Sequence, residues 1–162
     1  MEKQNKPLTR EEAEKEGYNV YSYPNGDYDY EDKNGIIHLI RDRKELCKGY
    51  YVFFYENGDY EYEDKNHICH LIRNGKEICK GNYVYSYSNG DYSFEDEKGI
   101  KHLMRNGKEL CKGTFVDSFD NGDYFYRDEN GIYHYCRIFD GYVWERRGKN
   151  GNYAYVDHNG KI

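Results

Sequence analysis

Short runs of alternating apolar and polar residues make up most of the chain, and each run ends at a turn signal. Residues 27–32, for example, place tyrosines and carboxylates at alternate positions, which is the period of a half-buried β-strand. Asn-Gly pairs separate many of these runs. Asn-Gly between such runs is a strong hairpin signal, because a type I′ turn needs positive φ at both positions. The pattern therefore predicts a succession of antiparallel hairpins.

The turn signals recur at a fixed period. Asn-Gly-Asp begins at Asn25, Asn57, Asn89 and Asn121, each 32 residues after the last. Glycine-containing breaks set units at 17–48, 49–80, 81–112 and 113–143, with a partial unit at 144–162. The turns predict four short strands per unit, since an odd number would reverse the direction of successive units. Such internal repetition indicates a repeat architecture.

We therefore expect an all-β fold over residues 17–162, in which tandem four-stranded antiparallel meanders form an open or rolled sheet. A small β-propeller is the alternative, although propeller blades usually run about 40–45 residues. Residues 1–16 form a separate N-terminal segment. Thr9 and Glu12 have the spacing of a capping box, and good helix formers follow them. This predicts a short helix that caps the first unit; a solvated acidic tail is the alternative.

Two-residue turns would fix which residues face each other across the hairpins. They would place Tyr23 opposite Tyr28, and Leu39 opposite Leu46. The same count pairs further aromatic and aliphatic residues in later units: Tyr55 with Tyr60, Tyr87 with Tyr92, Leu71 with Ile78, and Leu103 with Leu110. One face of the sheet is thus expected to be an aromatic and aliphatic core. The opposite face, rich in carboxylates, is expected to be partly exposed.

The same count brings an acid, an imidazole and a thiol together in three units. The predicted rows are Glu31–His38–Cys47, Glu63–His70–Cys79 and Glu95–His102–Cys111. Such a row contains the parts of a thiol hydrolase, and paired rows could supply four zinc ligands. A structural ladder is the favoured interpretation, because three identical rows supply neither a unique pocket nor an oxyanion hole. The Glu–His pairing depends on the second turn having two residues, since a slip of one would move Glu31 to the other face.

Composition and charge narrow the function classes. Aromatic residues make up 18% of the chain, which indicates a folded protein despite 33% charged residues. The net charge of −6 and the lack of a long basic tract argue against a nucleic-acid partner. The start of the chain lacks the apolar stretch of a signal peptide, and no apolar run approaches the length of a membrane span. We therefore expect a cytoplasmic protein whose five cysteines are thiols.

The leading functional hypothesis is a non-enzymatic scaffold that binds another protein through its repeated tyrosine and acidic surface. The partner is expected to be basic, a peptide, or without charge. One such role for this protein would be that of a phage or mobile-element protein that inhibits a host defence protein. The alternatives are a small-ligand module for a carbohydrate or nucleotide, and a metal-binding His/Cys protein. No cofactor is expected. Exposed sheet edges at 17–23 and 153–162 could also form an edge-to-edge homodimer. The candidate binding residues are Tyr60, Tyr92, Tyr124, Asp59, Asp91, Asp123 and Trp144.

A partial family resemblance supports the scaffold hypothesis. Residues 148–162, Gly-Lys-Asn-Gly-Asn-Tyr-Ala-Tyr-Val-Asp-His-Asn-Gly-Lys-Ile, resemble bacterial WG-type repeats, which read approximately Asn-Gly-Lys-Tyr-Gly-Phe-Ile-Asp-x-x-Gly-Lys-Ile. Residues 89–100 follow the same outline, and the Trp-Gly pair of the family is absent from both segments. The hairpins are also similar, in a more general way, to MORN-type repeats. Both resemblances imply a β-rich scaffold for protein or membrane contacts, and neither implies functional residues.

Overall fold

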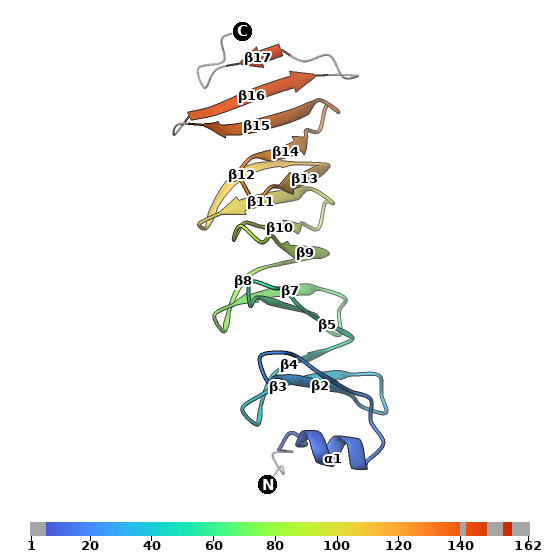
Figure 1. The fold of residues 1–162 in the computed structure, drawn as a ribbon. Helices are drawn as coiled ribbons and strands as arrows, with labels where there is room; N and C mark the ends of the chain where they lie inside the picture. The colour runs from blue at the N-terminus through green and yellow to red at the C-terminus, as the bar shows by residue number, and fades with distance from the viewer. Residues whose placement is uncertain (1–5, 140–141, 149–153, 157–162) are drawn as a thin grey trace.

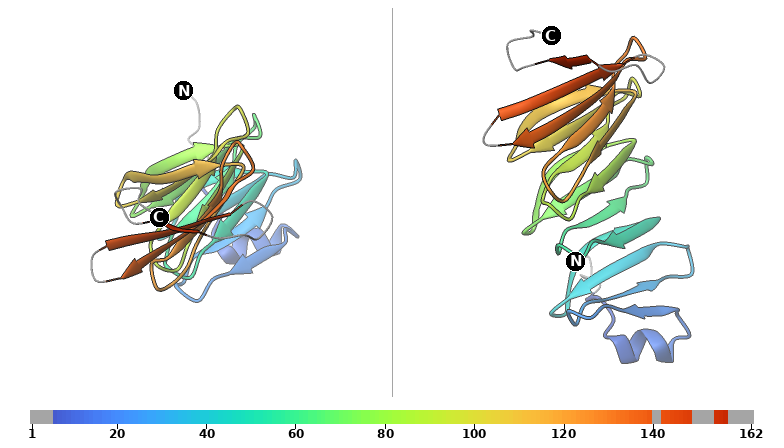
Figure 2. Two further views of the ribbon diagram at one scale, coloured as in Figure 1. Left: turned by 90° about the horizontal axis from the view of Figure 1, so that it is seen from above. Right: turned by 45° about the horizontal axis from the view of Figure 1, so that its top comes forward.

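Four antiparallel sheets are stacked one above another in an open column (Figure 1). The structure, a computed structural model, describes residues 6–139, 142–148 and 154–156. Each of the first three sheets has four strands in chain order, and the last sheet has five. Figure 2 shows the column from above and tilted, with each sheet following the one before it along the column.

One repeat unit supplies each of the first three sheets. The first sheet contains β1 (Val20–Ser22), β2 (Tyr28–Glu31), β3 (Ile37–Arg41) and β4 (Lys44–Gly49). The second contains β5 (Tyr51–Phe54), β6 (Tyr60–Glu63), β7 (Cys69–Arg73) and β8 (Lys76–Gly81). The third contains β9 (Tyr83–Ser86), β10 (Tyr92–Glu95), β11 (Lys101–Arg105) and β12 (Lys108–Gly113). The fourth contains β13 (Phe115–Ser118), β14 (Tyr124–Arg127), β15 (Tyr133–Phe139), β16 (Tyr142–Gly148) and β17 (Ala154–Val156).

The predicted all-β fold of four-stranded antiparallel repeats is confirmed, and the arrangement is open. This fold shares with a propeller blade the antiparallel meander within each sheet. The expected boundary between residues 143 and 144 falls inside β16, which is the fourth strand of the last sheet. Residues 157–162, which carry part of the WG-type resemblance and of the expected C-terminal edge, lie outside the described residues.

The first turn of each unit has three residues rather than two, so the predicted tyrosine pairs are wrong by one position. The Tyr23 N–H donates to the Asp27 carbonyl at 2.9 Å, and the Gly26 N–H donates to the Tyr23 carbonyl at 3.0 Å. Gly26 has φ +89°, in the left-handed region that glycine adopts without strain. Tyr28 consequently pairs with Ser22 rather than with Tyr23. The corresponding pairs in the next two units are Phe54 with Tyr60 and Ser86 with Tyr92.

The second and third turns separate the predicted Glu–His–Cys rows. At the second turn the Asp32 N–H donates to the Ile36 carbonyl, so Glu31 faces Ile37 and not His38. The third turn has two residues, as predicted, but the register of the two strands shifts between Leu39 and Ile40, two residues away from the turn. Cysteine therefore faces leucine in every row, and histidine faces lysine. The observed pairs are Leu39 with Cys47, His38 with Lys48, Leu71 with Cys79, His70 with Lys80, Leu103 with Cys111, and His102 with Lys112.

The predicted N-terminal helix is α1 (Arg10–Lys15), and its capping box is formed as expected. Thr9 Oγ1 accepts the Glu12 N–H at 3.2 Å, and Glu12 Oε2 accepts the Thr9 N–H at 2.7 Å. Ala13 is fully buried and packs with Tyr30 and Ile40 of the first sheet. The helix therefore covers the outer face of the first sheet, where a preceding unit would otherwise pack.

The three interfaces between sheets have separate hydrophobic cores. Each core combines a leucine from the third strand of one sheet with residues of the next sheet: Leu39 with Tyr60 and Ile72, Leu71 with Val84 and Tyr92, and Leu103 with Val116 and Tyr124. The predicted aromatic and aliphatic core is therefore divided among the interfaces. Both faces of the inner sheets are covered, except near the outer edges.

A glycine lies where the chain passes from one sheet to the next. A Cβ on Gly81 would lie 2.1 Å from the carbonyl oxygen of Glu95, whose oxygen also accepts the Asn82 N–H at 2.9 Å. The corresponding contacts at the other crossings are Gly49 with Glu63 and Gly113 with Arg127, at 1.9 and 2.0 Å. Glycine is needed at these positions because the two backbones approach too closely for a side chain.

Candidate binding surface

The aspartates of the Asn-Gly-Asp turns are buried, which corrects the expectation of an exposed acidic face. Asp59 is 3% exposed, and Asp91 and Asp123 are each 2% exposed. Asp59 accepts hydrogen bonds from Arg73 Nε at 3.0 Å and Arg73 Nη2 at 2.6 Å. Because a buried carboxylate is costly unless it is paired, the arginine of the third strand compensates the burial of this charge.

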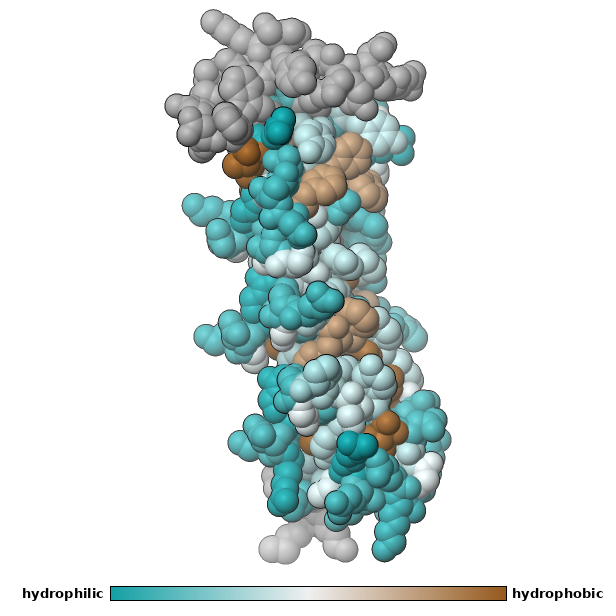
Figure 3. Space-filling model, in the orientation of Figure 1, coloured by the Kyte–Doolittle hydropathy of each residue, from teal (hydrophilic) through white to brown (hydrophobic). Residues whose placement is uncertain are grey.

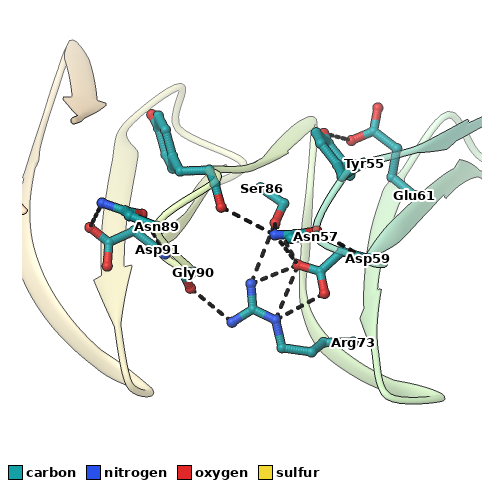
Figure 4. A network of polar contacts seen from close by, with 10 residues as sticks. Tyr55, Asn57, Asp59, Glu61, Arg73, Ser86, Asn89, Gly90 and Asp91 are labelled. Atoms are coloured by element: carbon teal, nitrogen blue, oxygen red, sulfur yellow. Dashed lines mark hydrogen bonds and ion pairs between the residues drawn. The ribbon is translucent and has the colours of Figure 1, made fainter. Parts of the chain in front are cut away.

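The same arginines and turns connect neighbouring sheets (Figure 4). Arg73 Nη1 donates to the Gly90 carbonyl in the third sheet at 2.8 Å, and Ser86 Oγ donates to Asp59 Oδ2 at 2.5 Å. Asn57 Nδ2 also donates to Ser86 Oγ at 2.7 Å. The next junction repeats this network with Asn89, Asp91, Arg105, Ser118 and Gly122. The Asn-Gly-Asp turns are therefore parts of the joints between sheets.

The first junction differs from the two that follow it. Arg41 binds Asp27 within the first sheet, at 2.6 Å from Nη2 to Oδ2. Phe54 occupies the position that Ser86 and Ser118 hold in later units. Its ring centroid lies 4.4 Å from that of Tyr23, so an aromatic contact replaces the serine hydrogen bonds at this junction.

The histidines lie between two carboxylates instead of beside thiols. His70 Nδ1 is 2.6 Å from Glu77 Oε2, and its Nε2 is 3.3 Å from Asp64 Oδ2. The ring also stacks on Tyr62, with centroids 4.7 Å apart. His38, His102 and His134 have equivalent partners. Both ring nitrogens are therefore engaged within the protein, which is the arrangement of a structural ladder.

The thiols are half-buried or buried and lie against the interfaces between sheets. Burial raises the pKa of Cys47 and of Cys79 to about 12, and that of Cys69 to about 11. A thiol with such a pKa is protonated at neutral pH and is a poor nucleophile. Within the described residues, no group of three or more histidine, cysteine and acidic side chains is placed to hold a metal ion.

The tyrosines predicted to bind a partner also lie in the interfaces between sheets. Tyr60, Tyr92 and Tyr124 are only 5%, 6% and 8% exposed, because their faces of the sheets are covered by the preceding units. The expectation that they form an exposed surface is therefore wrong. Trp144 lies in β16 opposite Arg137, and its side chain is outside the part of the chain that the structure describes.

Other aromatic residues are exposed. Most of them lie on the first strands of the sheets, β1, β5, β9 and β13, and form one set. We call this set the aromatic stripe: Tyr21, Tyr51, Phe53, Tyr83, Tyr85 and Phe115. Tyr21 is 63% exposed, and Phe53 and Tyr85 are 45% and 40% exposed. The first strand is at the edge of each sheet, so the next sheet in the column does not cover its outward-facing rings. On one face of the column, apolar side chains form patches among hydrophilic ones (Figure 3).

Two clefts lie along the aromatic stripe, one at each of the first two junctions. The first has a volume of about 480 Å³ and lies between Tyr21 and Tyr23 of one sheet and Phe53 and Tyr55 of the next. The second, of about 260 Å³, lies between Phe53 and Tyr55 on one side and Tyr85 on the other. Phe53, Phe54, Tyr55 and Glu56 line both clefts. The second sheet therefore supplies a shared wall.

Two carboxylates, the half-buried Asp29 and the buried Glu61, hold two of the cleft tyrosines in place. The Tyr23 hydroxyl donates to Asp29 Oδ2 at 2.5 Å, and the Tyr55 hydroxyl donates to Glu61 Oε2. Burial raises the pKa of Asp29 and of Glu61, and the tyrosine hydrogen bonds partly offset this rise. Burial and the neighbouring acid also raise the pKa of both tyrosines. The rings are thus anchored at their hydroxyl ends.

The sequence contains signals for the Asp–Arg ion pairs and for the aromatic stripe, but pairing residues across assumed two-residue turns did not use them. Arg41, Arg73 and Arg105 recur at the 32-residue period together with the aspartates, which indicates a repeated ion pair. The aromatic residues of the first strands recur at alternate positions, such as Tyr51, Phe53 and Tyr55. Alternation places them on one face, but the sequence does not reveal how far the next sheet covers that face.

Comparisons with known proteins do not assign the chain to a family. No family model matches the chain, and no curated protein matches it. The resemblance to WG-type repeats therefore stays a prediction. Among solved structures, the WD40 β-propeller domain of Doa1 matches with a TM-score of 0.37 and 14% identity, over 75% of this chain and 51% of that one. The C-terminal WD40 domain of Sif2 matches with a TM-score of 0.38 and 10% identity, over 82% of this chain and 58% of that one. The chain thus spans little more than half of either structure, and both scores are too low to carry an argument about function.

The described residues contain no helix with the length and apolar character needed to cross a membrane.

Proposed function

We propose that this protein is a non-enzymatic scaffold that binds a partner protein through the aromatic stripe. The observation that carries the proposal is the exposure of Tyr21, Phe53 and Tyr85 along successive edge strands. Exposed apolar patches of this kind often mark interaction sites, and aromatic residues dominate the energetics of many interfaces. The engagement of the histidines and the raised pKa of the thiols agree with a role that does not depend on their chemistry.

Affinity capture with a matched set of variants tests this proposal. The bait is the full chain, compared with Phe53→Ala, Tyr85→Ala and the double variant. Tyr50→Ala is the control, because Tyr50 is 48% exposed but stacks on His67 away from the clefts. A specific partner should be lost from the stripe variants and retained by the control. Equal retention by all variants would remove the stripe as the binding surface.

The narrower role as an inhibitor of a host defence protein has its support in small size and acidity, and the same capture tests it. The lysate should come from phage-infected and uninfected host cells, because an inhibitor of defence should retain a defence protein from one or both. Capture of proteins unrelated to defence in both lysates would exclude this role and leave the scaffold proposal in place.

A small-ligand module is the second candidate function, and the first cleft is the observation that favours it. Its volume of about 480 Å³ lies within the range of roughly 300–1,000 Å³ that is usual for ligand pockets. Aromatic walls could stack on a sugar or a nucleotide base. Titration calorimetry with oligosaccharides and nucleotides tests this candidate, and a saturable signal that Phe53→Ala abolishes would support it.

A further inference from the structure

The charge in both clefts of the aromatic stripe is negative and comes from one residue. Among the described residues that line them, Glu56 is the only charged one, and it lines both clefts. Glu56 is exposed and forms no ion pair with another described residue. Tyrosine and phenylalanine rings line both clefts together with Glu56, and the face of such a ring carries negative charge density. Aromatic faces beside a carboxylate are suited to bind a cation.

The protein already binds one of its own cations in this way. Lys101 Nζ lies 5.3 Å from the ring centroid of Tyr83, a member of the aromatic stripe, and 3.9 Å from Glu95 Oε2. Tyr83 belongs to the first strand of its sheet, as Phe53 does in the preceding one. The surface chemistry of the stripe therefore accommodates a cationic side chain between a ring and a carboxylate.

From these contacts we infer that the partner is a basic segment, which inserts one arginine or lysine side chain into each of the two clefts. This inference rests on the proposed function and adds the chemical class of the partner to it. Each cation lies against the aromatic walls, and Glu56, which lines both clefts, attracts both cations. The net charge of −6 favours the approach of a basic segment from a distance.

The stacking of the sheets sets the spacing of the two cations. The clefts lie at successive junctions, and stacked sheets are about 10 Å apart. A polyproline II segment rises about 3.1 Å per residue and returns to the same face every third residue. Two cations three positions apart therefore match the spacing of the clefts, as in a segment of the form Arg-x-x-Arg.

Fluorescence anisotropy with dye-labelled peptides tests this inference on the full chain. The probe contains Arg-Pro-Pro-Arg, and its matched control carries citrulline, an uncharged analogue, in place of both arginines. The arginine peptide should bind saturably, and the citrulline peptide should bind at least about tenfold more weakly, because it lacks both cation–π and carboxylate contacts. A peptide with the two arginines adjacent should also bind more weakly.

Variants of the chain locate the binding. Glu56→Gln should lower the affinity for the arginine peptide by about fivefold, which corresponds to roughly 1 kcal/mol of binding free energy. Phe53→Ala should abolish binding, since Phe53 lines both clefts. Glu129→Gln, an exposed acid outside the clefts, and Tyr50→Ala should bind as the parent does. Circular dichroism establishes that each variant is folded.

The following results would each overturn the inference. They are no saturable binding of the arginine peptide, equal binding of the citrulline peptide, and an affinity that Glu56→Gln leaves unchanged. Binding of an oligosaccharide in the clefts without binding of the peptide would also overturn it. A captured partner that depends on Phe53 but not on Glu56 would leave the proposed function standing and remove the basic segment. A partner that depends on neither would remove both.

Discussion

At the scale of single residues, the turn aspartates form the polar centres of the junctions. Asp91 accepts hydrogen bonds from Arg105 and from Ser118 of the next sheet, and its N–H donates to Asn89. Arg105 also donates to the Gly122 carbonyl. Loss of one partner from such a buried network leaves another charge uncompensated, and this is more costly than loss of a surface ion pair.

Asp91→Asn should therefore lower the free energy of unfolding by about 3 kcal/mol, because the half-buried Arg105 would lose its counter-charge. Urea denaturation followed by circular dichroism measures the change. Asp27→Asn is the matched control. Its partner Arg41 is more exposed than Arg105, with side-chain exposures of 39% and 21%, so its loss should cost less. Equal effects at both sites would contradict the role of the junction network.

Glu61 gives the protein a predicted dependence on pH. Burial raises the pKa of Glu61 above its ordinary value of 4.5, and the Tyr55 hydroxyl partly offsets the rise. The folded state therefore holds this proton more tightly than the unfolded state. The resulting stabilisation is fully present below pH 4.5 and is lost as the pH rises through the raised pKa of the folded state.

Glu61→Gln cannot titrate, so its stability relative to the parent should increase between pH 4.5 and pH 7. Urea unfolding midpoints of both proteins across this range measure the difference. Glu97→Gln, at an exposed position, should follow the parent at every pH. A constant difference between Glu61→Gln and the parent would show that burial does not shift this carboxyl group.

At the scale of elements, the sequence predicted where the turns are, but not the length of the first turn of each unit. Asn25-Gly26 marks a turn in either case, because glycine allows positive φ in both the two-residue and the three-residue form. Hydrogen bonds from Tyr23 to Asp27 select the longer form. A change of one residue moves every side chain of a strand to the other face. This is why the predicted strands were confirmed while the predicted tyrosine pairs and the expected surface position of the turn aspartates were wrong.

The crossing glycines yield a prediction for the connections between elements. Gly81→Ala would place a Cβ 2.1 Å from the Glu95 carbonyl oxygen, and the backbone there cannot withdraw without loss of the Asn82 hydrogen bond. The substitution should destabilise the protein by about 2 kcal/mol or more, as steric overpacking does elsewhere. Thermal unfolding measures the loss. Lys80→Ala, one residue earlier and exposed, should change stability by no more than about 0.5 kcal/mol. Similar stabilities of the two variants would contradict the close approach.

At the scale of the whole molecule, repetition predicted the number and kind of units, but not how they pack. Each unit was expected to contribute to a sheet with one covered face. In the structure each of the first three units forms its own sheet and packs on the next, so Tyr60 is buried while Phe53, near the outer edge, is exposed. Which rings remain exposed depends on the offset between successive sheets. That offset arises from contacts between units, and the pattern within one unit does not contain it.

The stacked arrangement predicts that damage at one end remains local, because each unit contacts only its neighbours. Ala13 is fully buried between α1 and the first sheet, so Ala13→Glu would bury an unpaired charge there. Hydrogen exchange should become at least about 30-fold faster in β1–β3, the effect of losing roughly 2 kcal/mol of local stability. Exchange in β10–β12 should stay as in the parent. Lys15→Glu, an exposed change in the same helix, should have a much smaller effect. Equal acceleration in the first and third sheets would instead show that the column unfolds as a single cooperative unit.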